Sequence, residues 1–212
     1  MTIPLLVFIL TSISVYISLM IYHGIPTHIN YVCSQANRAL GFIRRQLGKC
    51  TVNVKLKAYL TLVRPHLEYA SCSWDPHTDS HINQIEMVQH RAVRFVLNKY
   101  SHHESVTQML NELELNSLEL RRKNARLCLF FKIHKGLTPL VIPPQLNLKP
   151  VQRRTDNGCA YEHFASHSNP LYSSFYPRTV RDWNSLSPNL VTQGNIDTFS
   201  ELLGYQRPDC SH

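Results

Sequence analysis

Acidic residues are scarce in the first third of this chain, where no Asp or Glu occurs before Glu68. The whole sequence has 22 Lys and Arg against 14 Asp and Glu, which gives a formal net charge of +8. The basic residues gather over Arg38–Arg64 and again over Arg121–Lys135. This distribution favours a polyanionic partner, either nucleic acid or an anionic membrane face. A soluble domain with a basic surface remains the simpler alternative.

Motifs for catalysis are also missing. The chain has no Gly-rich phosphate loop, no G-x-S-x-G and no H-E-x-x-H. No two aspartates are adjacent, so the sequence lacks the carboxylate pair that holds two Mg²⁺ ions for phosphoryl transfer. We therefore predict no catalytic centre and no cofactor.

The six cysteines are irregularly spaced and form no C-x-x-C pair. This pattern favours a reduced intracellular protein over a disulfide scaffold. Structural zinc normally needs four ligands with closer cysteine pairing, so we predict no metal. Two sets come nearest to metal-ligand spacing: Cys72, His77 and His81, and Cys159, His163 and His167.

The N-terminal segment 1–24 is the one long apolar run. Thr2 to Tyr22 carries no charge, and 21 residues are about the length that a helix needs to cross a ~30 Å hydrocarbon core. We expect a transmembrane helix over 2–22, with the basic residues that follow it on the cytoplasmic side. Alternatively, this segment was translated out of its original context, and the chain is then cytoplasmic or nuclear.

The remaining pattern predicts a mainly α protein, with a bundle of about five helices over 28–138 and a Pro-rich, loop-rich region over 139–212. Pro65 should break or kink the second helix, whose inward side we assign to Val54, Ala58 and Thr61-Leu62. We expect a capping box at Ser105 and Gln108, and a cap at Ser117. The predicted helices are 28–47, 51–63, 79–98, 105–113, 117–134 and 197–203, and a hairpin is considered between Cys159 and Arg178.

Several segments occur in the order found in a known family. The most specific is Leu62-Val63-Arg64-Pro65-His66-Leu67-Glu68-Tyr69, followed by Trp74-Asp75-Pro76 and later by Asp182-Trp183-Asn184. The chain from about 28 to 203 resembles the region after the palm in LINE-type (non-LTR) retrotransposon reverse transcriptases of the jockey-like group. Other matching segments are Ala39–Arg45, Ile85–Phe95, Ser105–Leu110, Leu118–Arg122 and Ser174–Arg178.

The resemblance implies a piece of an RNA-directed DNA polymerase without its palm aspartates and without the endonuclease domain. What remains is a non-catalytic, thumb-side module, which in the family grips the template–primer duplex. It would bind RNA or an RNA–DNA duplex through phosphates, without sequence preference. The absence of a palm predicts an exposed apolar patch. The candidate phosphate-contacting residues are Arg38, Arg44, Arg45, Lys55, Lys57, Arg121 and Arg122.

Two other functions stay open on the sequence. One is a single-pass membrane protein with a basic cytoplasmic domain. The other is a host-adopted protein-interaction module.

Overall fold

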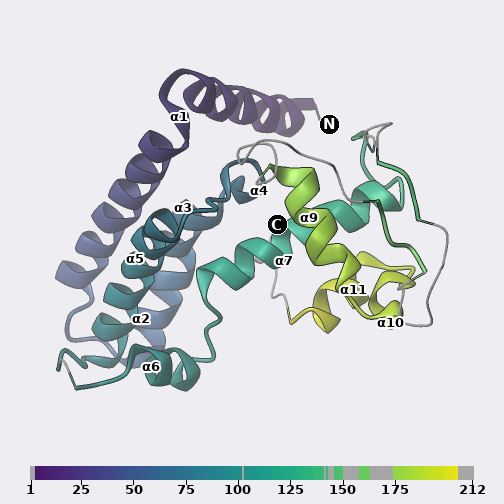
Figure 1. Cartoon of the computed structure of the whole chain (residues 1–212). Helices are drawn as coiled ribbons and strands as arrows, with labels where there is room; N and C mark the ends of the chain where they lie inside the picture. The colour runs from purple at the N-terminus through teal and green to yellow at the C-terminus, as the bar shows by residue number, and fades with distance from the viewer. Residues whose placement is uncertain are drawn as a thin grey trace. The chain divides into compact units, whose positions relative to one another are not determined.

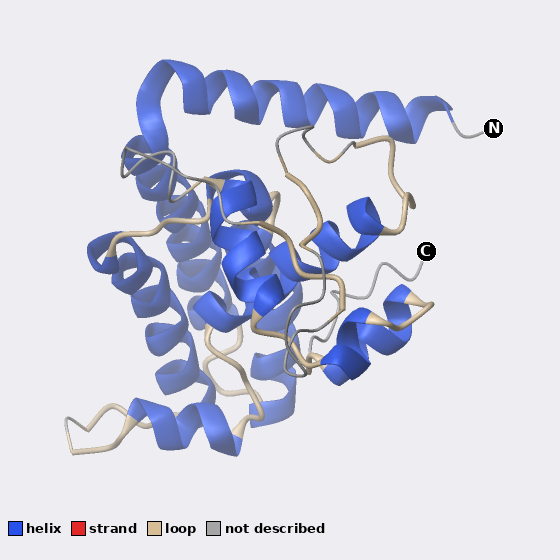
Figure 2. Cartoon of the chain, turned by 45° about the vertical axis from the view of Figure 1, so that its right-hand side comes forward, coloured by secondary structure: helices blue, strands red, loops and turns tan. Residues whose placement is uncertain are grey.

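The computed structural model describes residues 3–101, 103–140, 142, 146–149, 158–162 and 174–204, with side chains from Gly24 onward. Within these ranges every regular element is a helix, and a single antiparallel bridge joins Leu148 and Tyr161 (Figures 1 and 2). The prediction of a mainly α protein is confirmed. The chain divides into two compact units, residues 1–120 and residues 121–212, each with its own core.

This division falls earlier than the predicted boundary at 138/139. The long helix over Leu118–His134 begins in unit 1, but its apolar residues from Leu127 onward form part of the second core. The sequence shows that Leu127–Phe131 is an apolar run within this helix, and it does not show which core this run joins.

Unit 1 contains more helical segments than the about five that were predicted for the bundle, because the second predicted helix is divided. The segments are α1 (Ile3–Gln46), α2 (Val52–Ala58), η1 (Tyr59–Val63), α3 (Arg64–Glu68), α4 (Ser71–Trp74), α5 (Asp79–Leu97) and α6 (Val106–Glu112), with the start of α7 (Leu118–His134) (Figure 1).

Helix α1 changes direction at Gly24, which has non-helical backbone angles (φ 72°, ψ 162°) and lies two residues before Pro26 (Figure 1). Pro26 cannot donate a backbone hydrogen bond to the preceding turn. Glycine accepts the positive φ without a Cβ penalty. The predicted transmembrane segment 2–22 lies outside the residues whose side chains are described. Among the residues that the structure describes, no helix is both long and apolar enough to span a bilayer.

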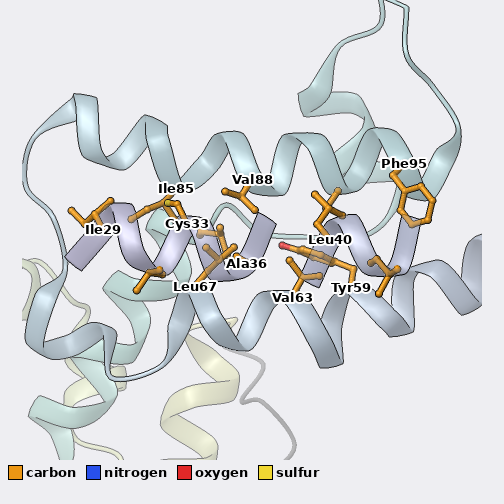
Figure 3. Packing of buried hydrophobic residues seen from close by; sticks show 14 of the residues in the cluster. Ile29, Cys33, Ala36, Leu40, Tyr59, Val63, Leu67, Ile85, Val88 and Phe95 are labelled. Atoms are coloured by element: carbon orange, nitrogen blue, oxygen red, sulfur yellow. The ribbon is translucent and has the colours of Figure 1, made fainter. Parts of the chain in front are cut away.

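The core of unit 1 lies between three helical segments (Figure 3). Ile29 to Leu40 of α1 and Ile85 to Phe95 of α5 run in the same direction, and Tyr59 to Leu67 run in the opposite direction (Figure 3). The helices predicted over 28–47 and 79–98 are present, and each buries an apolar stripe. Their buried members are Ile29, Val32, Cys33, Ala36, Leu40, Ile43, Ile82, Ile85, Val88, Ala92, Phe95 and Val96.

Of the predicted break or kink at Pro65, the break is wrong, because the helix continues through a π-helical turn to Glu68. Arg64 donates its backbone N–H to the Tyr59 carbonyl, five residues back. Pro65 then falls in the first turn of α3, where its missing N–H is tolerated. π-Helical turns are rare and occur mostly as single turns inserted into α-helices, as here.

The inward side of this helix was predicted only in part, since Ala58 packs against the core but the other assigned residues do not. Val54 and Leu62 are exposed, and the buried residues follow every four positions instead: Lys55, Tyr59, Val63 and Leu67. A regular α-helix has 3.6 residues per turn, so a strict four-residue spacing would drift around its surface. The wider π turn corrects that drift and keeps the four side chains on one face.

Side chains of α5 hold the start of α7. The predicted cap at Ser117 is confirmed, because the Leu120 backbone N–H donates to Ser117 Oγ at 3.2 Å. Glu86 Oε1 accepts from the Glu119 N–H at 2.7 Å, and Gln89 Nε2 donates to the Asn116 carbonyl. The helix predicted after Ser105 is also present, but Ser105 makes no side-chain capping bond, so the capping box is wrong there.

Unit 2 is more helical than the predicted loop-rich region. The predicted last helix is confirmed as α11 (Ile196–Leu202), and two further helices, α9 (Phe175–Asn184) and α10 (Pro188–Val191), precede it. The hairpin considered between Cys159 and Arg178 is wrong from Phe175 onward, where the chain is helical; residues 163–173 lie outside the described residues.

The core of unit 2 consists largely of aromatic rings. The ring centroids of Trp183 and Phe130 are 5.0 Å apart, and those of Phe131 and Phe199 are 4.4 Å apart.

Three consecutive residues of α9 connect this helix to its neighbours. Asp182 pairs with Lys123 and Arg126 of α7, each at 3.0 Å. Trp183 Nε1 donates to the Cys159 carbonyl at 3.0 Å. Asn184 accepts from the Tyr161 N–H at 3.0 Å and donates to the Tyr161 carbonyl at 2.9 Å. The Asp182-Trp183-Asn184 motif therefore organises the second core.

Buried His28 makes the stability of unit 1 depend on pH. Its ring lies edge-to-face on Trp74, 5.3 Å between centroids, and burial lowers its pKa below 6.5. Burial also lowers the pKa of His90, against an opposing effect of Glu86. The unfolded state therefore binds more protons than the folded state. The neutral histidines contribute fully to the free energy of unfolding above about pH 6.5, and this contribution is lost as the pH falls from there towards their folded-state pKa values.

We expect the urea concentration at the unfolding midpoint of unit 1 to decrease when the pH is lowered from 7.5 to 5.5. Unfolding of unit 1 is measured by Trp74 fluorescence in a Trp183→Phe background. His28→Phe should make this fall shallower, because the ring no longer takes up a proton on unfolding. A pH slope that His28→Phe leaves unchanged would contradict the role given to this histidine.

Candidate nucleic-acid interface

An open groove runs along the outer side of α1 where this helix meets α5. Arg38 and Arg45 line it, and both are exposed. The other lining residues are polar or small, and none is acidic: Asn30, Cys33, Ser34, Asn37, Gly41 and Gln84. The groove lies entirely within unit 1.

Two polar bridges connect the helices along this groove. Gln84 Nε2 donates to Asn30 Oδ1 at 2.6 Å, and Arg91 Nη1 donates to Asn37 Oδ1 at 3.2 Å. The partners are seven residues apart on both helices. Seven residues are about two helical turns, so equal steps on two parallel helices repeat the same contact. The bridges fix the register of α1 against α5 and hold Arg91 beside the groove.

The positive charge of the groove meets no opposing charge from α1, because the sequence has no acid before Glu68. On α5, the Glu86 carboxylate is buried and accepts the Glu119 N–H. The Arg45 guanidinium lies back along α1 over Gly41, where a Cβ would be in ordinary van der Waals contact with Arg45 Nη1 at 3.5 Å. The surface is suited to phosphate groups, which arginine binds through charge and several N–H donors.

Only two of the seven predicted phosphate-contacting residues line the groove. Arg38 and Arg45 are brought together in the groove. Arg44 is exposed on α1 and Lys57 is exposed on α2, and neither lines the groove.

The assignment of Lys55 has to be corrected, because its side chain is fully buried. Its ammonium group donates to Asn98 Oδ1 at 2.8 Å and lies 4.9 Å from the centroid of the Phe95 ring. Lys55 therefore joins α2 to the C-terminal end of α5, where the helix dipole favours a cation. A phosphate cannot reach this ammonium group in the folded unit.

Arg121 and Arg122 also have to be corrected, since both side chains are buried. They belong to α7 at the start of unit 2. Because a phosphate contact requires an exposed guanidinium, neither arginine is available for one. The charge cluster in the sequence gave no sign of this burial, because α7 is amphipathic only weakly and charged residues occur on most of its sides.

Sequence reasoning did not identify the polar residues that complete the groove. Arg91, Asn30, Asn37 and Gln84 all lie on helices that were predicted, but none was assigned to a site. The available signal was the equal seven-residue spacing of polar residues on the two helices. This spacing indicates paired contacts only once α1 and α5 are known to be parallel neighbours.

No cluster of three or more His, Cys, Asp or Glu side chains suited to a metal ion occurs in the part of the chain that is described. His163 and His167 lie outside it. No family model matches the chain, and neither the curated proteins nor the solved structures include a significant match.

Proposed function

We propose that this chain is a non-catalytic, thumb-side fragment of a LINE-type reverse transcriptase that binds nucleic acid through phosphates in the α1–α5 groove. The partner is RNA or an RNA–DNA duplex, bound without sequence preference. The module supplies a grip and no chemistry, since the chain has no adjacent aspartates for two-metal catalysis.

The observation that carries this proposal is the pairing of Arg38 and Arg45 in a groove without acidic residues. Isolated surface arginines are common and carry little information. Here two exposed arginines line one groove, and a third, Arg91, lies beside the groove and donates to its lining residue Asn37. Sequence-independent binding to a phosphate backbone requires such a cluster of accessible cations and no base-specific contacts.

The proposal predicts a steep dependence of binding on salt. For the full chain and an RNA–DNA hybrid, log K should fall linearly with log salt concentration, because each neutralised phosphate releases condensed counterions. Arg38→Gln together with Arg45→Gln should reduce the steepness of this slope by about 0.9 for each phosphate that is no longer neutralised, as measured by fluorescence anisotropy.

Lys149→Gln is the matched control, because Lys149 is exposed in unit 2 and the substitution also removes a positive charge. Lys55→Met should leave the salt slope unchanged, since Lys55 is buried. If the groove and control variants weaken binding equally for each charge removed, binding follows net charge, and the groove assignment would then be withdrawn.

A second candidate function rests on the uncharged 2–22 segment, which fits a single-pass membrane protein with a basic cytoplasmic domain. Membrane fractionation of the expressed chain separates the two proposals. Retention in the membrane after alkaline carbonate washing favours the membrane protein, and release of the chain favours the nucleic-acid module.

A third candidate, a protein-interaction module, is favoured by exposed apolar side chains on α2 and η1, among them Val54 and Leu62. Exposed apolar residues that lie together commonly indicate a binding surface. This function predicts a folded chain whose affinity for nucleic acid is low at every salt concentration.

A further inference from the structure

Two large aromatic side chains are exposed on α1 beside the groove arginines. Tyr31 is 46% exposed and Phe42 is 52% exposed. Both belong to the well-packed second half of α1, whose opposite side is buried in the core of unit 1. Their exposure therefore does not come from an unpacked helix.

The aromatic rings alternate with the arginines along one side of the helix, in the order Tyr31, Arg38, Phe42 and Arg45. We call these four residues the α1 ladder. At about 100° per residue, the successive steps of seven, four and three residues keep all four positions within about 60° of one another around the helix axis. At about 1.5 Å per residue, the ladder is about 21 Å long.

From this arrangement we infer that the α1 ladder binds unpaired nucleotides, with bases stacked on Tyr31 and Phe42 and phosphates held by Arg38 and Arg45. The inference rests on the proposed nucleic-acid function and specifies its substrate: single-stranded RNA or DNA, or the single-stranded part next to a duplex. A continuous duplex hides the faces of its bases and offers only phosphates to this helix.

Charge complementarity favours this partner. No acidic residue precedes Glu68, so no carboxylate of α1 repels a phosphate along the ladder. Single-strand-binding surfaces combine a cationic track with aromatic rings, because every base has a face that can stack. The ladder has both kinds of group in alternation. An apolar docking surface for a protein would not need a cation between its two rings.

The test compares a single-stranded oligouridine with an RNA–DNA hybrid of the same length, using the full chain and fluorescence anisotropy. We expect Tyr31→Ser and Phe42→Ser each to weaken oligouridine binding by about 5- to 150-fold, the range found when a stacking ring is removed. Hybrid binding and its salt slope should change little, because both arginines remain. Tyr31→Trp should retain the affinity for oligouridine.

Tyr100→Ser is the matched control, since Tyr100 is 53% exposed and lies outside the ladder. Circular dichroism of each variant confirms that α1 remains folded. If the serine variants weaken oligouridine binding no more than Tyr100→Ser does, the stacking inference is overturned. The proposed phosphate grip still stands in that case, provided that Arg38→Gln lowers the salt slope.

A chain that binds neither oligonucleotide overturns both the inference and the proposed function. Vesicles of phosphatidylcholine and phosphatidylserine provide the last arm. If the serine variants reduce vesicle binding and leave oligouridine binding unchanged, the ladder lies on an anionic membrane surface, and the inference is wrong.

Discussion

Trp183→Ala is expected to destabilise unit 2 by about 3–5 kcal/mol, the usual cost of removing a large aromatic side chain from a core. Trp183 is fully buried and has the rings of Phe130, His134 and Phe199 within 6.0 Å between centroids. Its Nε1–H also donates to the Cys159 carbonyl. The substitution therefore leaves a cavity and removes a hydrogen bond that holds a neighbouring segment.

Hydrogen–deuterium exchange with mass spectrometry measures this effect in each unit separately. Peptides from α9 and α11 should lose protection in Trp183→Ala, while peptides from α5 in unit 1 provide the internal comparison. Trp183→Phe keeps a six-membered ring but removes the pyrrole part of the indole and its N–H, so its cost should be smaller than that of Trp183→Ala and include about 1–2 kcal/mol for the lost hydrogen bond. A small effect of Trp183→Ala on α9 protection would contradict the central place of this ring.

Asp182→Ala is expected to cost about 2–4 kcal/mol, because it removes the carboxylate that pairs with buried Arg126. The Arg126 side chain is 3% exposed, and its Nη2 lies 3.0 Å from Asp182 Oδ2. Breaking a fully buried pair costs about 3–5 kcal/mol, since one charge stays in a medium of low polarity. The expected value is somewhat lower because the Asp182 side chain is 23% exposed.

A double-mutant cycle isolates this pair. Arg126→Met removes the charge and keeps an apolar side chain, so Asp182→Ala should cost much less in the Arg126→Met background. The exposed pair of Lys99 and Glu112 is the control: although its atoms are only 2.6 Å apart, Glu112→Ala should cost much less than Asp182→Ala, because solvent screens exposed charges. Equal costs for Asp182→Ala and Glu112→Ala would show that burial does not decide the strength of this interaction.

The Asp182 and Trp183 predictions also bear on the resemblance to the reverse transcriptases. The Asp182-Trp183-Asn184 segment is one of the elements that carry it, and in this chain its three side chains each contact a different neighbour of α9. The motif is thus explained by packing and hydrogen bonding within unit 2. It needs no contact with a ligand.

The helices with regular periodicity were predictable from the sequence alone. The apolar residues of α1 and α5 recur every three or four positions, and burial of that stripe is the main source of helix stability in a folded protein. The cap at Ser117 was predictable for a local reason, since it depends on one side chain at the helix end.

The π turn at Tyr59–Val63 was not predictable in this way. A pattern of 3.6 residues per turn assigned Val54 and Leu62 to the core, whereas the observed four-residue spacing accompanies a π turn that packs against α1. The burial of Lys55 follows from the same shift in phase.

Local patterns were thus enough to establish the helical class, the inward side of the regular helices and the strongly basic character of the first third. Which basic residues are available to a partner depends instead on how the helices pack. In a sequence, a lysine that will be buried cannot be distinguished from one that will be exposed by its charge or spacing. The exposure of its side chain depends on neighbours that are distant in the chain. Asn98 and Phe95 enclose Lys55, whereas α5 meets α1 in parallel and leaves Arg38 and Arg45 together in an open groove.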